Sequence, residues 1–164
     1  MSVPETPSSA ASPRAPVPTT HLEIDRRLCG QPVEIAPGRA RVSLRTLPEM
    51  RADARGLVHG GFVFGLADYA AMLAVGDPNV VLGAAETRFL APVAVGETVI
   101  AEARMRPTGN EPGAERRRTV EVRARCGEET VFTGDFTCFV LDAHVLEGRA
   151  HRRPGAKAEA GEEG

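Results

Sequence analysis

The distribution of apolar residues along the chain predicts one long helix. The longest apolar segment begins at Val58, ends near Val75 and contains Ala, Leu and Met throughout; Gly76-Asp77-Pro78 follows it. This segment is too long for an ordinary strand, and apolar residues occupy nearly every side of the predicted helix. Because such a helix has to be covered on all sides, we expect it to lie at the centre of the fold.

Extended segments follow the helix and are rich in Val, Thr and Phe. Pro92, Gly96, Gly127 and a turn over 108–113 separate them. Short turns between successive strands favour antiparallel pairing, because parallel strands need long crossover connections. The predicted strands cover residues 41–45, 79–90, 97–106, 117–126 and 130–141. We therefore predict an α+β fold in which an antiparallel sheet of about five strands wraps around one central helix.

A second, short helix is predicted over residues 21–29. The tetrapeptide Thr20-His21-Leu22-Glu23 has the form of a capping box, and Gly30 stands where a glycine often ends a helix. The segments at the two ends of the chain lack the apolar residues that a core requires. We expect one domain over 20–146, flanked by disordered tails over 1–19 and 147–164.

Composition and charge exclude several classes of protein. The 164 residues include 20 Lys and Arg against 22 Asp and Glu, a balance that argues against a general nucleic-acid binder. No segment approaches the roughly 18–20 apolar residues of a membrane span, and the N-terminus lacks a secretory signal pattern. Cys29, Cys126 and Cys138 have neither CxxC nor CxxH spacing, which argues against a disulfide scaffold or a zinc site. We expect a cytoplasmic protein without a metal.

Candidate chemistry begins at the entrance of the long helix, at His59-Gly60-Gly61. The first turn of a helix has unpaired N–H groups and the positive end of the helix dipole, which favour a carbonyl oxygen or an oxyanion. Glycine lets a ligand approach the backbone closely. The same two glycines also suit a tight turn that binds nothing, and the pattern alone does not separate the two interpretations.

Asp68 is the only charged residue between His59 and Gly76. It is either a structural residue, paired or at a helix edge, or a general base or nucleophile in a cleft. Gly60 and Asp68 are eight residues apart, roughly 12 Å along a helix, so one helix cannot bring both to the same carbonyl. If they act together, Gly60 comes from one chain and Asp68 from an antiparallel partner in a two-fold homodimer.

Three motifs in the same order resemble the PaaI-like group of hotdog-fold acyl-CoA thioesterases. They are Val58-His59-Gly60-Gly61, Leu66-Ala67-Asp68 and the segment FLAPVAVGE from Phe89 to Glu97, and the resemblance covers about residues 41–141. It implies a dimerising hotdog fold, with dimers that in some cases pair into tetramers. It also implies hydrolysis of an acyl-CoA to a carboxylic acid and CoA, with no cofactor besides the CoA of the substrate.

The resemblance also assigns roles to individual residues. The N–H of Gly60 would polarise the thioester carbonyl, with Gly61 in the same binding turn. Asp68 of the partner chain would act as general base on water or as nucleophile. His59 would orient the loop or the substrate; the alternative is a structural histidine that is hydrogen-bonded to the backbone.

The chain departs from the resemblance at two positions. Six residues before the histidine, where relatives often have an Asn that contacts substrate or water, stands Asp53, which is either a second carboxylate of the site or a loop residue. Relatives often have a Ser or Thr on the strand after the helix, whereas residues 82–85 have no hydroxyl. Glu86, with Thr87 after it, is the nearest polar candidate for substrate binding.

Arg116-Arg117-Arg118 stands where members of this family often contact the phosphates of CoA, and arginine suits phosphate. We assign Arg117 and Arg118 to substrate binding; a solvated hairpin base is the alternative. Four apolar side chains of the helix are candidates for an acyl tunnel, with core packing as the alternative: Phe62, Phe64, Met72 and Leu73.

The function predicted from the sequence is therefore that of an acyl-CoA thioesterase. The alternative is a non-catalytic domain that binds acyl-CoA or acyl-carrier protein. The missing strand hydroxyl favours this alternative, whereas Asp68 opposes it. A hotdog dehydratase ranks third, because its Asp and His pair follows a different pattern.

Overall fold

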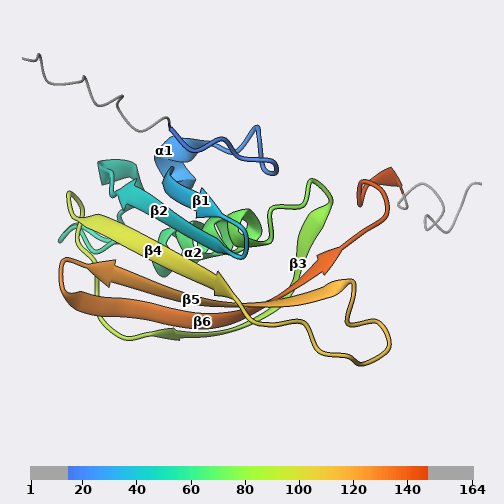
Figure 1. The fold of residues 1–164 in the computed structure, drawn as a ribbon. Coiled ribbons are helices and arrows are strands. Elements are labelled where there is room, and N and C mark those ends of the chain that lie inside the picture. The colour runs from blue at the N-terminus through green and yellow to red at the C-terminus, as the bar shows by residue number, and fades with distance from the viewer. Residues whose placement is uncertain (1–14, 148–164) are drawn as a thin grey trace, which may run out of the picture.

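An antiparallel sheet curves around helix α2 (Gly60–Val75) in the computed structural model, which describes residues 15–147 (Figure 1). Within these residues the sheet has six strands in the order β1-β2-β4-β5-β6-β3. Their bounds are Gln31–Ala36 for β1, Arg39–Arg45 for β2, Val80–Phe89 for β3, Thr98–Met105 for β4, Arg117–Cys126 for β5 and Glu129–Val140 for β6. The predicted α+β architecture is confirmed; the predicted tails lie almost entirely outside the described residues.

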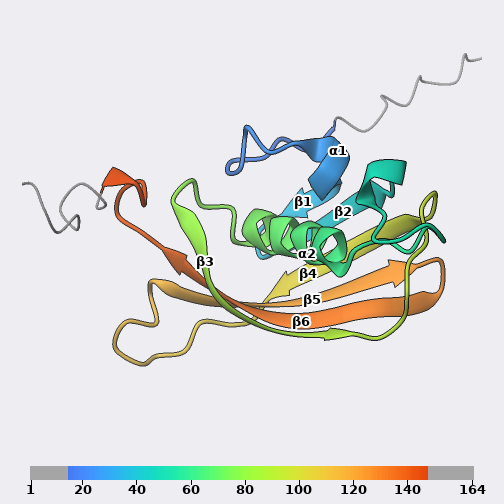
Figure 2. The same cartoon turned by 180° about the vertical axis from the view of Figure 1, so that it is seen from behind.

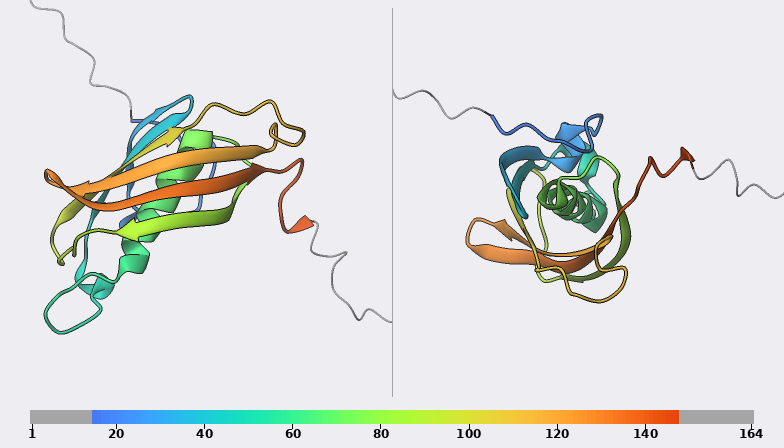
Figure 3. Two further views of the ribbon diagram at one scale, coloured as in Figure 1. Left: turned by 90° about the horizontal axis from the view of Figure 1, so that it is seen from below. Right: turned by 45° about the vertical axis from the view of Figure 1, so that its right-hand side comes forward.

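The central helix is enclosed by the concave face of the sheet, which the right-hand view of Figure 3 shows end-on. Nine of its residues are buried, and it ends at Gly76, whose left-handed φ of 68° accompanies an N–H donated to the Met72 carbonyl. On β4 and β5 buried and exposed residues alternate, so that small side chains such as Ala101 and Ala103 face the helix. Small side chains let the helix lie close to the sheet.

The sixth strand, β1, was not predicted. It pairs only with β2 and forms one edge of the sheet, so its side chains are half exposed and show little alternation. Pro32 lies within it, and an edge strand tolerates a proline because one side of its backbone needs no partner. The other edge of the sheet is β3, which Figure 2 shows from behind. The central residues of β3 are small and exposed.

The prediction of a helix over residues 21–29 was wrong in extent and in its cap. Helix α1 covers only Arg26–Cys29, and the Asp25 side chain caps it by accepting a hydrogen bond from the Arg27 N–H at 2.9 Å. His21 has a left-handed φ of 53°, which a helix does not allow. The Thr20 hydroxyl lies 2.9 Å from Nδ1 of His21 and caps no helix.

Among residues 15–147, no helix has both the length and the apolar character that a bilayer crossing requires.

Gly30 joins α1 to β1 in a position that only glycine fits. Its φ is 104°, and a Cβ there would lie 2.7 Å from Cγ1 of Val42 and 2.9 Å from Cδ1 of Leu66. Gly30→Ala should therefore lower the free energy of unfolding by about 2 kcal/mol or more, measured by urea denaturation. Gly109→Ala is the matched control, because a Cβ at Gly109 meets no atom within 4 Å. Equal losses in the two variants would contradict the steric explanation.

Candidate active site

The first turn of α2 leaves one backbone N–H unpaired. Nδ1 of His59 accepts a hydrogen bond from the Gly61 N–H at 2.9 Å, and the His59 carbonyl accepts one from the Phe62 N–H at 3.0 Å. The Gly60 N–H has no acceptor among the described residues. Because N–H groups of a first turn have no intrahelical partner, Gly60 presents a donor at the positive end of the helix.

His59 is the N-cap of α2, and this contact fixes the state of its ring. Because Nδ1 accepts a hydrogen bond, the proton of the neutral imidazole is assigned to Nε2. The His59 N–H donates to the Met50 carbonyl at 2.9 Å, which ties the turn to the preceding 3₁₀ helix, Pro48–Met50. These contacts are the backbone hydrogen bonds expected of a structural histidine, and they also hold the loop in place, so the role of His59 toward a substrate stays a prediction.

Both glycines are explained by close neighbours. A Cβ at Gly61 would lie 2.8 Å from Nδ1 of His59, so a larger residue would displace the capping ring. A Cβ at Gly60 would lie 3.0 Å from Cε1 of Phe89, a ring at the end of β3. The two glycines therefore permit the cap on one side and the aromatic contact on the other.

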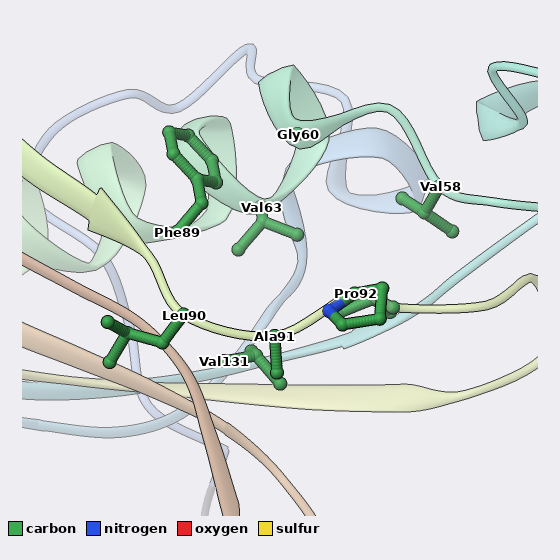
Figure 4. A pocket seen from close by; sticks show the side chains of 9 residues that line it. Val58, Gly60, Val63, Phe89, Leu90, Ala91, Pro92 and Val131 are labelled. Carbon is green, nitrogen blue, oxygen red and sulfur yellow. The ribbon is translucent and has the colours of Figure 1, made fainter.

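An apolar pocket of about 380 Å³ lies beside Gly60 (Figure 4). None of its lining side chains carries a charge or a hydroxyl. The lining residues are Val58, Gly60, Val63, Phe89, Leu90, Ala91, Pro92, Val93 and Val131.

The predicted acyl-tunnel residues do not line this pocket. Met72 and Leu73 are buried in the core, and the Phe64 ring lies 5.6 Å from that of Phe136. Phe89 and Val131, which do line the pocket, were missed as site residues. Phe89 is the first residue of the FLAPVAVGE motif, and its place in that motif was the one sequence feature that could have marked it as a site residue.

Asp68 lies two turns further along α2, and its Oδ1 is buried without a hydrogen-bond partner among the described residues. Burial raises the pKa of its carboxyl group from 3.8 to about 6. On the sheet, Asp68 acts on Cys138 of β6, whose pKa is raised to about 12 by burial and, secondarily, by the charge of Asp68. Asp68 is thus a half-buried carboxyl group that stays available to a ligand or a partner chain.

Within one protomer, Gly60 and Asp68 face different ends of β6. The Gly60 pocket includes Val131, near the start of that strand, whereas Asp68 interacts with Cys138, near its end. Seven residues of a strand span roughly 23 Å. One chain therefore does not bring the free N–H and the carboxyl group together.

Arg117 and Arg118 lie at the Asp68 end of the sheet, since Arg118 pairs with Cys138 across β5 and β6. Arg118 is folded back on its hairpin and donates to the carbonyls of Ala114 and Arg117, each at 3.1 Å, and to that of Glu115. Arg117 is exposed. Of the two, Arg117 is the side chain that projects free of its own hairpin.

Asp53 and Glu86 are not brought to Gly60. Oδ1 of Asp53 accepts hydrogen bonds from the N–H groups of Arg55, at 2.9 Å, and Leu57, at 3.2 Å, within its own loop. Glu86 pairs directly with Asp135, an exposed position on the face of the sheet away from α2. Both remain predicted substrate contacts, but the contacts of Asp53 serve the loop that leads into α2.

Comparison with known proteins supports the motif-based resemblance. Residues 55–132 match the thioesterase superfamily. This segment, just under half of the chain, thus resembles members of the superfamily. A solved structure of an uncharacterised protein, PH1136 from Pyrococcus horikoshii, is 48% identical, with a TM-score of 0.75 over 80% of this chain and 98% of that one.

The recognition of a PaaI-like hotdog fold is confirmed by a second solved structure. A point mutant of the phenylacetic acid degradation protein PaaI from Thermus thermophilus is 28% identical, with a TM-score of 0.61 over 70% of this chain and 95% of that one. The thioesterase superfamily and the hotdog fold therefore follow from the sequence and from the structure alike.

The curated relatives of this chain have other names and are longer. A methylthioribose-1-phosphate isomerase of Aquifex aeolicus is 48% identical over 124 residues, which are 75% of this chain and 26% of that protein. The transcription factor FapR of Bacillus cytotoxicus is 37% identical over 95 residues, 57% of this chain and 46% of that protein. This chain thus spans about a quarter of the isomerase and under half of the transcription factor.

Asp68 should make stability depend on pH. Because its folded pKa is raised from 3.8 to about 6, the folded state binds the proton more tightly, and stability falls as the pH rises through this range. Asp68→Asn removes the free-energy cost of burying an ionised carboxylate. It should stabilise the fold by roughly 3 kcal/mol above pH 6, with the gain lost near pH 4. Denaturation of both proteins between pH 4 and 8 measures it; a gain independent of pH would contradict the buried carboxyl group.

Proposed function

We propose that this protein hydrolyses an acyl-CoA thioester to a carboxylic acid and CoA. The observation that carries the proposal is the unpaired Gly60 N–H beside an apolar pocket of about 380 Å³. A thioester has the matching chemistry, because its carbonyl oxygen needs a donor as negative charge develops and its acyl group needs an apolar site. No cofactor takes part in this reaction, and we expect it in the cytoplasm.

The carboxyl group would come from a second copy of the chain. β3 is an edge strand, and its exposed central residues, Gly83, Ala84 and Ala85, leave its outer side open to pairing. Pairing β3 over its full length with an antiparallel copy aligns Val80 with Phe89 and puts a two-fold axis between Ala84 and Ala85.

The position of this two-fold axis is also compatible with the position of α2. The Phe64 ring packs on Phe136, and Phe136 pairs with Ala85, so Phe64 lies level with the centre of β3. Gly60 and Asp68 are each four residues from Phe64, on opposite sides of it. An axis at this level would bring Gly60 of one protomer toward Asp68 of its partner, so the helix is compatible with the axis proposed for the strand.

The incompletely buried stripe of α2 fits a second helix. Gly61, Phe64, Gly65 and Asp68 recur at helical spacing, and none of them is fully buried by the sheet. A Cβ at Gly65 would meet no atom within 4 Å. Small residues allow two helices to approach closely, so the carboxyl group of Asp68 can reach across the interface.

In the proposed reaction the thioester oxygen accepts a hydrogen bond from the Gly60 N–H, and the helix dipole stabilises its growing charge. The ionised carboxylate of the partner's Asp68 either takes a proton from an attacking water or attacks the carbonyl carbon itself. The carbon–sulfur bond breaks and CoA leaves as a thiol after protonation. A pKa of about 6 keeps the carboxylate ionised at neutral pH and makes it a stronger base than an exposed Asp.

The CoA moiety would extend toward the arginines of the partner subunit. Arg117 and Arg118 lie at the same end of the sheet as Asp68, so an axis that delivers Asp68 to the site also brings these side chains nearer. Arg117, which is exposed, is the better placed to contact a phosphate.

A second function is favoured by one observation. The segment of β3 from Leu82 to Ala85 has no hydroxyl to hold an attacking water. Without such a group the same pocket suits a domain that binds acyl-CoA or acyl-carrier protein without turnover. The similarity to a transcription factor, FapR, agrees with this alternative.

Thiol release from a panel of acyl-CoAs tests the proposed hydrolysis. Wild type should turn over at least one acyl-CoA, with a rate that rises with pH through about 6. Asp68→Asn should abolish turnover while preserving the dimer, as measured by light scattering. Saturable acyl-CoA binding without turnover in wild type would instead establish the binding domain.

Two variants at Gly60 separate the effect of losing the backbone N–H from the effect of adding a side chain. Gly60→Ala and Gly60→Pro both add a Cβ beside Phe89, but only proline removes the N–H. Proline is tolerated at the first helical position, and His59 before it has the extended ψ of 129° that a proline requires. Gly60→Pro should lower kcat by about 10²–10³ relative to Gly60→Ala. Equal rates in the two variants would remove Gly60 from the mechanism.

A further inference from the structure

The pocket beside Gly60 has a chemistry that selects among acyl groups. All nine lining residues are apolar or glycine, and the four valines among them, Val58, Val63, Val93 and Val131, are buried. A carboxylate or hydroxyl at the far end of an acyl group would lose water there and gain no partner from these side chains. The pocket therefore suits a plain hydrocarbon chain.

Phe89 stands at the entrance of this pocket. Its ring is 57% exposed, yet it is held edge-on by Phe132, with ring centres 5.1 Å apart. The same ring contacts the Gly60 position. A group bound beside Gly60 in this pocket therefore lies next to this ring.

The backbone around Phe89 is fixed, so the ring is a lasting wall of the pocket. The strand β3 ends at Phe89, and the next two residues, Leu90 and Ala91, donate hydrogen bonds to the Val131 carbonyl at 2.8 and 3.4 Å. The segment that carries Phe89 is thereby tied to the strand that supplies Val131, which lies beside Ala91 in the pocket lining (Figure 4).

We propose that Phe89 is the specificity-determining residue of the site and that the acyl group is an uncharged aliphatic chain of short to medium length. This inference rests on the proposed function, because it takes the pocket as the acyl site. The pocket holds about 380 Å³. At roughly 30 Å³ for a group the size of water or methylene, it accepts on the order of ten non-hydrogen atoms. Longer chains have to extend out of the pocket and past the Phe89 ring.

Ketone analogues of acyl-CoA test this proposal separately from hydrolysis. They keep the carbonyl and the acyl chain but have no bond that a hydrolase can cleave, so their dissociation constants report on the pocket alone. The probes are the butyryl, octanoyl, palmitoyl and succinyl analogues. Wild type should bind the butyryl and octanoyl analogues best and the succinyl analogue roughly 100-fold more weakly, because succinyl brings a carboxylate into the pocket.

Two substitutions should move the length preference in opposite directions. Phe89→Ala should improve palmitoyl over butyryl binding by about tenfold, and Phe89→Trp should shift preference toward the shorter chain. Leu146→Ala is the matched control, since Leu146 is also 57% exposed but lies outside the pocket. It should leave the order of affinities unchanged. Melting temperatures close to that of wild type establish that each variant is folded.

The outcomes separate the two proposals. If the Phe89 variants change the preferred chain length of the ketone analogues but no thioester is hydrolysed, the pocket is the acyl site and only the proposed hydrolysis is overturned. Turnover whose chain preference is the same in wild type, Phe89→Ala and Phe89→Trp overturns the role of Phe89 and leaves the hydrolase standing. Tighter binding of succinyl than of butyryl overturns the assignment of an uncharged acyl group.

Discussion

The cap on the first turn of α2 is the contact on which the rest of the site depends. Nδ1 of His59 takes the Gly61 N–H, and the His59 carbonyl takes that of Phe62, so one donor remains and its direction is set by the helix. Free donors in a first turn are common, but this one opens onto an apolar pocket where water competes weakly. A substitution at His59 or Gly61 would therefore change the hydrogen bonds of this turn even if neither residue contacts a ligand.

A second constraint comes from the length of a helix. The central helix is enclosed by the sheet, and its one carboxyl group lies two turns from its one free donor. A protein that needs both at one carbonyl has to bring them from two chains. The edge position of β3, its small exposed residues and the open stripe of α2 are consistent with this arrangement, and the proposed two-fold axis lies level with Phe64.

Much of the fold followed from hydrophobic patterning. The helix from Val58 to Val75 and the strands over 79–90, 97–106, 117–126 and 130–141 correspond to α2 and β3–β6 within a few residues. The edge strand β1 was not predicted, because the apolar and polar residues of a half-exposed edge strand alternate only weakly. The predicted capping box at Thr20 was wrong, because the side chain of Asp25 caps α1 instead. Gly60, His59 and Asp68 were visible as motif residues. The role of Phe89 was not, since it depends on a ring meeting a glycine 29 positions away in the chain.

The central claim is that each site is shared between two protomers, and mixing two inactive variants tests it most directly. In a heterodimer of Gly60→Pro with Asp68→Asn, one site carries both substitutions and the other carries neither. Unfolded and refolded together in equal amounts, the two variants should recover about a quarter of wild-type thioesterase activity, since half the dimers are mixed and each has one intact site. A mixture as inactive as its two components, with heterodimers shown to have formed, would contradict a shared site.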